Sequence, residues 1–273
     1  MTRQFKRVVR VIVGAPGKEG RIIEGLRISF EVIKQDGFAL NSAKIKIYNA
    51  TDDTIAVAST RDAAIQLIAG YREQVGLIFL GTVTRVTASR DGSDRIVEIE
   101  SADGFANLGK PAALTIKGGS SLKDSFGPLA GIAGQALDLA GINPDEQLQA
   151  PRGVTLAGPV YGQINRIARL NRLDWTIEDD RIVVVRRGES TRLPALLITP
   201  NTGLIGSPKP GEARRVELRM LLNPEARLRR IIQLEARDIN GWFLTRRIKH
   251  LGDSGFASDY YTELEASIIR NPR

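Results

Sequence analysis

The sequence predicts a mainly β protein with an α+β insertion between two similar small β-barrel domains. Three observations lead to this fold class. Hydrophobic and polar residues alternate through much of the first hundred residues, as in strands with one buried face. Hydrophobic residues recur at helical spacing in the middle of the chain, and strand-like segments return in the last third. We therefore expect domains at 1–110, 111–190 and 191–273.

The first part of the chain is expected to form a meander of about six strands. One apolar face comprises Leu26, Ile28, Phe30 and Val32. Asp36-Gly37 is a strong turn signal, and further strands are expected over 43–47, 64–69, 76–86 and 95–101. Thr51 is a candidate N-cap for a short helix that ends near Ala58, because acidic residues follow it. Strands at this spacing indicate a small barrel or sandwich.

The middle of the chain has the pattern of a small α+β unit. A helix is expected over 121–140, with a break or restart at Gly127-Pro128. A second helix is expected over 161–170. A hairpin should follow, with strands at 174–178 and 181–186 joined by a turn at Asp179-Asp180.

The last part of the chain returns to β structure. Strands are expected over 196–199, 216–222, 230–236, 242–251 and 260–266. Residues 200–211 are rich in Gly and Pro and are expected to form a loop.

The two β-rich parts also resemble each other. Each contains a strand that ends in Asn, then a strand of the form Ile-Gln-Leu-x-Ala, then a strand that begins with Gly and carries Phe-Leu. These segments lie at 44–49, 65–69 and 76–80, and again at 216–223, 232–236 and 241–244. Chance similarity between two β meanders is the alternative. A true repeat would give one chain two barrels, and a closed ring of three chains six.

Composition excludes several kinds of site. The 273 residues include no cysteine and one histidine, which rules out disulfides, thiolate metal sites and a cysteine nucleophile. We expect no metal and no cofactor. No apolar run approaches the roughly 20 residues that span a bilayer, so we expect no membrane anchor. The net charge of +8 suits nucleic acid, an acidic membrane surface or an acidic protein, and equally a surface rich in arginine.

Catalytic motifs are weak, and we expect no enzymatic activity. The single histidine, His250, has Asp253 and Ser254 near it in sequence, but no Gly-x-Ser-x-Gly motif exists. The segment 14–20 departs from a phosphate-binding loop in its glycine spacing and has Glu where Ser or Thr would bind magnesium. Glu235 and Glu265 are the candidates for an acid whose pKa is raised by an apolar setting, yet both fit the outer face of a strand equally well.

Several motifs, in this order, resemble those of bacteriophage tail or baseplate hub proteins, a class that also resembles the base of type VI secretion spikes. They are Gly25-Leu-Arg-Ile-Ser-Phe, Ile47-Tyr-Asn-Ala, Leu67-Ile-Ala-Gly-Tyr, Ile78-Phe-Leu-Gly, Trp175-Thr-Ile-Glu-Asp-Asp-Arg-Ile-Val-Val, Thr199-Pro-Asn-Thr-Gly-Leu-Ile-Gly-Ser-Pro, Leu221-Leu-Asn-Pro and Lys249-His-Leu-Gly-Asp-Ser. Each motif is loose, and their order across about 25–266 carries the resemblance.

The resemblance implies a structural homotrimer with two tube-like barrels per subunit and no cofactor. Such a ring has pseudo-sixfold symmetry and joins the tail tube to the central spike or tip. Its partners are further copies of the chain, the tail tube protein, the spike or tip protein and other baseplate proteins. It is a virion component that is assembled in the host cytoplasm.

Two other functions stay open at this point. Tail tips can carry muralytic activity, which makes a tail-associated peptidoglycan hydrolase one alternative. A nucleic-acid-binding β-barrel is the other, because Arg166, Arg169 and Arg172 share a helical face and further arginines lie at 227, 229 and 230. A hub could also contact DNA that passes through its lumen.

Leu204 and Ile205 are the candidate interface residues. They place apolar side chains within the Gly/Pro-rich segment, where solvent would otherwise face them. We therefore expect them to dock onto a neighbouring molecule. The alternative is a loop that folds back on its own barrel.

Overall fold

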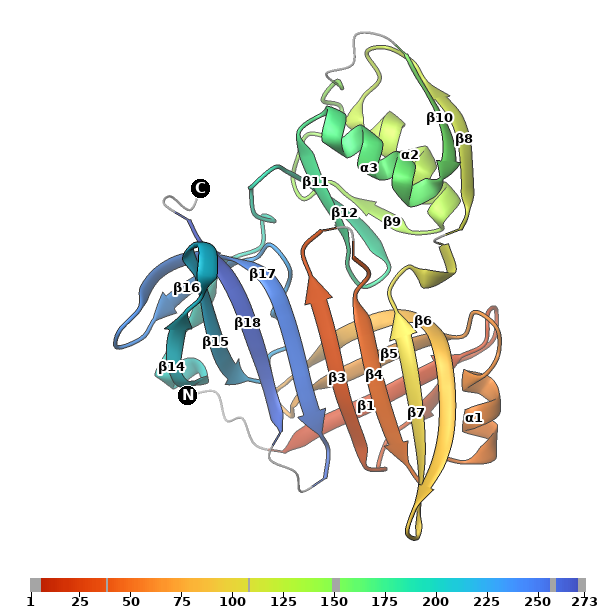
Figure 1. The fold of residues 1–273 in the computed structure, drawn as a ribbon, viewed down its shortest axis with the longest axis vertical. Helices are drawn as coiled ribbons and strands as arrows, with labels where there is room; N and C mark the ends of the chain where they lie inside the picture. The colour runs from red at the N-terminus through yellow and green to blue at the C-terminus, as the bar shows by residue number, and fades with distance from the viewer. Residues whose placement is uncertain (1–5, 38, 108, 149–152, 256–258, 270–273) are drawn as a thin grey trace.

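The computed structural model describes residues 6–37, 39–107, 109–148, 153–255 and 259–269. Three parts follow one another along the chain (Figure 1). The N-terminal lobe contains β1 (Arg7–Gly14), β2 (Arg21–Ile23), β3 (Ile28–Gln35), β4 (Ser42–Tyr48), α1 (Asp52–Ala58), β5 (Ala64–Tyr71), β6 (Gln74–Asp91) and β7 (Asp94–Ala102). The 3-10 turn Phe105–Asn107 leads out of it.

The insertion contains β8 (Pro111–Ile116), α2 (Leu122–Ala133), β9 (Ala136–Asp138), β10 (Val154–Pro159), α3 (Val160–Leu170), β11 (Leu173–Ile177) and β12 (Arg181–Arg186). The C-terminal lobe contains β13 (Leu196–Ile198), β14 (Leu204–Pro210), β15 (Arg215–Leu221), β16 (Ile231–Glu235), β17 (Asn240–Asp253) and β18 (Tyr260–Ile268). The prediction of a mainly β protein with an α+β insertion is therefore confirmed.

Strands of both lobes belong to one continuous sheet. The order is β14-β15-β18-β17-β3-β4-β7-β6-β5-β1-β2, with β16 paired to β17 and β13 to β16. The lobes are joined where β17 pairs with β3. Figure 1 shows this seam, with β17 beside β3 although the two are far apart in sequence. In the described residues the sheet path ends openly at β14 and β2, so the two closed barrels expected from the sequence are not confirmed.

The sequence repeat corresponds to a repeated strand order. The N-terminal lobe has the neighbours β3-β4-β7-β6-β5, and the C-terminal lobe has β14-β15-β18-β17-β16. Every neighbouring pair in both series is antiparallel. The long strands β6 and β17 each contain a register shift at the same point, after Val83 and after Thr245. Chance similarity does not account for a shared order and a shared bulge.

Each part has its own buried hydrophobic cluster. Representative members are Ile28, Ile45 and Phe79 in the N-terminal lobe, Phe126, Ile164 and Trp175 in the insertion, and Val216, Phe243 and Leu264 in the C-terminal lobe. Leu222 and Tyr260 are exceptions, since both belong to the C-terminal lobe but are buried in the N-terminal cluster. Tyr260 also makes hydrogen bonds there. Its hydroxyl lies 2.8 Å from the carbonyl oxygen of Val8 and accepts the amide of Gly70 at 3.0 Å. The two lobes are thus locked together at a second point.

Two local predictions were wrong. The expected helix over 121–140 ends at Ala133 and includes Pro128 without a break. Gly134 ends it in a left-handed conformation with φ of 71°, and β9 then pairs with β12. The expected loop over 200–211 contains a strand, β14, paired with β15. Prolines are tolerated there because β14 lies at the edge of the sheet and is bulged between Ile205 and Lys209.

Candidate functional site

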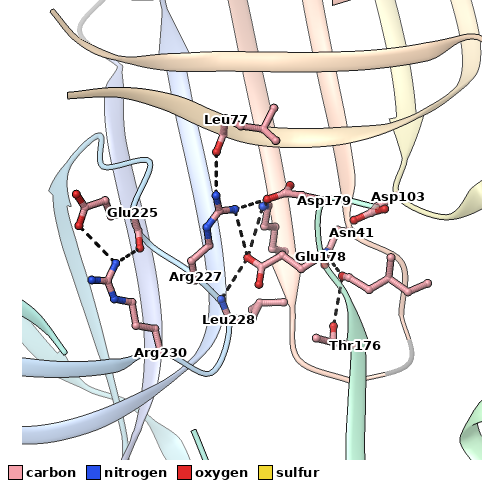
Figure 2. A network of polar contacts seen from close by, with 12 residues as sticks. Asn41, Leu77, Asp103, Thr176, Glu178, Asp179, Glu225, Arg227, Leu228 and Arg230 are labelled. Carbon is pink, nitrogen blue, oxygen red and sulfur yellow. Dashed lines mark hydrogen bonds and ion pairs between the residues drawn. The ribbon is translucent and has the colours of Figure 1, made fainter. Parts of the chain in front are cut away.

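A buried network of charges lies where the three parts meet. The turn between β11 and β12 carries Glu178 and Asp179 from the insertion. Lys34 on β3 places its Nζ 2.8 Å from Oδ1 of Asp179 and 3.6 Å from Oε1 of Glu178. Arg227, from the loop before β16, pairs with both of these carboxylates. Figure 2 shows Arg227 and Leu228 reaching Glu178 and Asp179 from the C-terminal lobe.

A second set of ion pairs extends this network through Arg229. Its guanidinium donates to Asp36 of the N-terminal lobe at 2.6 Å and to Asp174 of the insertion at 3.0 Å. Arg246 on β17 donates to the other oxygen of Asp36 at 2.7 Å. Arg229 therefore contacts all three parts of the chain from a position that is only 4% exposed. Such a network fixes the orientation of the parts relative to one another.

Burial dominates the electrostatics of this region. It raises the pKa of Glu178, although Lys34 and Arg227 act in the opposite direction. For Asp179 burial also acts to raise the pKa, but the charges and hydrogen bonds of the same two cations outweigh it and hold the pKa below its usual range. Burial lowers the pKa of His250 to about 3, and Lys34 contributes in the same direction. His250 is thus neutral at physiological pH.

Asp103 lies next to this network and has no cation of its own. It is fully buried, and its Oδ1 accepts the backbone amide of Asp180 at 3.1 Å. Its Oδ2 is buried and has no hydrogen-bond partner in the described residues. Burial raises the pKa of this carboxyl to about 7. Ionisation of this side chain therefore costs the fold stability as the pH rises.

The histidine and the two glutamates that were considered as catalytic candidates lie in the core or on the surface of the β-sheet. His250 is 1% exposed, and its Nδ1 lies 2.9 Å from Oγ1 of Thr262. Glu265 pairs with Arg247 at 2.8 Å on the outer face of the sheet, and Glu235 is exposed. Among the described residues no cluster of three or more metal-ligating side chains occurs. Nor does any helix there have both the length and the apolar character needed to cross a bilayer.

The two arginine groups differ in availability. Arg166, Arg169 and Arg172 lie exposed on or just after α3. Arg227 and Arg229 are instead engaged by carboxylates in the buried network. These two side chains are therefore not available for the nucleic-acid binding considered as an alternative. The nucleic-acid alternative then depends on the arginines of α3.

Leu204 and Ile205 lie at the start of β14, away from the tip of a loop. Leu204 is half-buried and packs against the cluster of the C-terminal lobe. Ile205 is 39% exposed on the open edge of the sheet. The structure thus separates the two residues, one facing the core and one facing solvent.

The outer face of the sheet carries paired charges across both lobes. Lys46 lies 3.4 Å from Glu98, and Arg219 lies 2.7 Å from Glu263 at the corresponding place in the other lobe. These side chains are partly exposed, so such pairs contribute little to stability. Both lobes thus carry ion pairs on this face.

Sequence reasoning missed the buried network, although one signal was present. Lys34 continues the series Ile28, Phe30 and Val32, and so falls on the buried face of β3. A lysine in such a position needs buried carboxylates as partners. The partners themselves were not predictable, because Asp179 is 145 residues away in the chain.

Comparison with known proteins identifies the family. The family model described as Baseplate hub gp41 matches residues 8–250. The chain belongs to this baseplate hub family. The resemblance to phage hub proteins seen in the sequence is therefore confirmed, and the chain is a structural component of a phage tail or baseplate. No curated protein matches the chain in sequence.

Solved structures share the fold of this hub protein. A 43 kDa tail protein of prophage MuSo2 from Shewanella oneidensis has a TM-score of 0.67 at 9% identity, with 95% of this chain and 96% of that chain covered. A tail protein from Neisseria meningitidis MC58 has a TM-score of 0.66 at 12% identity, with 96% of each chain covered. A type VI secretion component of E. coli has a TM-score of 0.58 at 12% identity, with 99% and 76% covered.

Proposed function

We propose that three copies of this hub protein form a ring with pseudo-sixfold symmetry that joins the tail tube to the central spike or tip. The observation that carries the proposal is the repeated strand order of the two lobes. Three chains would present six lobes of similar topology. A partner with true sixfold symmetry would then meet six similar positions.

In this proposal the chain divides into domains at 1–110, 111–190 and 191–273, and each lobe serves as one small barrel of the ring. The separate hydrophobic clusters of the three parts support the division. The charge network around Lys34 and Arg229 holds the parts in a single orientation. A rigid subunit suits a ring, because errors of orientation accumulate with each copy added.

The proposed partners are further copies of the chain, the tail tube protein, the spike or tip protein and other baseplate proteins. The ring is assembled in the host cytoplasm and becomes part of the virion. It needs no cofactor, and its contact with DNA is limited to passage through the lumen. We propose no catalytic role. Glu178 and Asp179 are engaged by cations, and the fully buried Asp103 holds the backbone amide of Asp180.

Substitution of Ile205 tests the interface that was proposed from sequence. We expect Ile205→Ser to raise the concentration needed for ring formation at least tenfold in mass photometry, because an exposed apolar side chain is lost from the sheet edge. Thermal unfolding should shift little. Leu204→Ser should instead destabilise the subunit, because Leu204 packs against the core.

Leu170→Ser provides the matched control. Leu170 is 55% exposed at the end of α3 in the insertion and lies outside the proposed edge. Its substitution should leave ring formation unchanged. If the Ile205→Ser variant forms rings at the same concentration as the wild type, Ile205 is not part of the interface.

A further inference from the structure

The seam between the two lobes is made by one half of a long strand. In β17, the residues beyond the bulge at 246 pair with β18 on one side and with β3 on the other. Leu251 lies opposite Glu31, and Asp253 lies opposite Ser29. This half of the strand is largely covered, with Ile248 and His250 fully buried.

In the N-terminal lobe, the strand equivalent to β17 is β6. Beyond its bulge at 84, it pairs with β7 from Arg85 to Asp91. On its other side β5 pairs with β6 only as far as Thr82. Within the described residues no strand covers the remaining edge, and the side chains from Thr87 to Asp91 are exposed.

In the C-terminal lobe, the strand equivalent to β3 is β14. It pairs with β15 on one side and ends the sheet path on the other. Five of its seven residues are exposed, whereas residues of β3 alternate between buried and half-buried. The molecule therefore has one paired seam, between β17 and β3. The equivalents of these two strands, β6 and β14, each have an open edge.

We propose that the open edge of β6 in one copy pairs, antiparallel, with the open edge of β14 in the next copy. This pairing repeats between copies the seam that already joins the lobes within one copy. This inference rests on the proposed ring and identifies the strands that would join neighbouring copies in it. Paired main-chain groups would then run through every junction of the ring.

The repeat also fixes the register of this pairing. Arg85 and Arg247 are equivalent, because each follows the bulge and lies opposite a glutamate. Lys209 is equivalent to Glu31, because Lys209 lies opposite Glu217 and Glu31 lies opposite Lys44 in corresponding strands. Transfer of the observed seam then places Ser89 opposite Lys209 and Asp91 opposite Ile205. Ile205 is the exposed residue that sequence reasoning assigned to an interface.

Proline content favours this pairing over the pairing of two β14 strands. Gly211 donates its amide to Arg215, so the adjacent Pro210 faces the open edge and has no amide to donate. Two such edges would leave acceptors without donors. The exposed half of β6, residues 85–91, contains no proline, so all of its amides on the open edge can donate to carbonyls of β14. Pairing β6 with β14 therefore brings the prolines of one strand into the contact, where a pair of β14 strands would bring those of two. A contact between two different edges is heterologous, and a heterologous contact gives a ring when the rotation from one copy to the next closes.

Disulfide trapping tests the register, and the chain has no cysteine to interfere. In the observed seam Ser254 donates its amide to Ile28, so Leu251 and Glu31 form a non-hydrogen-bonded pair with Cα atoms about 4.5 Å apart. Ser89→Cys and Lys209→Cys copies are mixed and oxidised. We expect at least tenfold more disulfide-linked dimer from the mixture than from either variant alone.

Thr87→Cys mixed with Lys209→Cys is the matched control, because Thr87 is two residues, or about 7 Å, out of register. Its failure to cross-link is expected. Cross-linking of Lys209→Cys with itself would show that β14 pairs with β14 and would overturn the proposal. If mass photometry detects rings but the Ser89→Cys and Lys209→Cys variants form no disulfide with each other, the edge pairing is wrong and the ring stands. Monomers at every concentration, with no disulfide, would overturn both the pairing and the ring.

Discussion

Replacement of Lys34 with methionine is expected to lower the free energy of unfolding by about 3–5 kcal/mol. Lys34 is fully buried, and its ammonium group lies between Glu178 and Asp179. Methionine preserves most of the volume and the unbranched shape but removes the charge. The two carboxylates would then share the single cation of Arg227. Urea unfolding followed by circular dichroism measures the change.

Lys44→Met is the matched control for this variant. Lys44 also lies on a strand of the N-terminal lobe and also has a carboxylate oxygen at 2.8 Å, that of Glu98, but its side chain is 49% exposed. Solvent screens such a pair, so the expected loss is much smaller than that for Lys34→Met. Equal losses for the two variants would contradict a stabilising role for the buried network.

Replacement of Asp103 with asparagine is expected to stabilise the protein at pH 8 by up to about 4 kcal/mol and to change little at pH 4. The fold raises the pKa of Asp103 from 3.8 to about 7. Between these values the folded state holds a proton that the unfolded state has released, so the wild type loses stability as pH rises. Asparagine carries no charge at either pH, and its oxygen still accepts the amide of Asp180.

Thermal unfolding of the two proteins at pH 4, 6 and 8 checks this prediction. His250 has a pKa of about 3 in the fold, which lowers stability as pH falls below about 6.5. That contribution is common to both proteins and cancels in their difference. A difference that does not grow between pH 4 and pH 8 would show that Asp103 is not held protonated by its surroundings.

Local patterns predicted the strands well where one face is buried and the other is solvated. The alternation of Ile28, Phe30 and Val32, and the hairpin around Asp179-Asp180, both lie where expected. The repeat motif anticipated the shared strand order, because equivalent strands bury equivalent side chains. β14 was missed because its glycines and prolines resemble a loop, and an edge strand has little need of an alternating pattern.

Contacts between residues far apart in the chain could not be predicted from local sequence patterns. Arg229 binds Asp36 across 193 residues, and such pairs depend on how the lobes meet. The seam between β17 and β3 joins the two ends of the chain in the same way. Ile205 was chosen from sequence as an interface residue for its exposure in a loop. It is now proposed as part of a specific strand edge, and this assignment stays a prediction.

Images of the purified hub protein test the central claim most directly. Averaged electron micrographs, with the mass of the particles measured in parallel, are predicted to show rings of three copies with a sixfold outline. Each junction in the ring, within and between copies, should show the same strand pairing. Monomers, twofold dimers or rings whose outline is not sixfold would contradict the account.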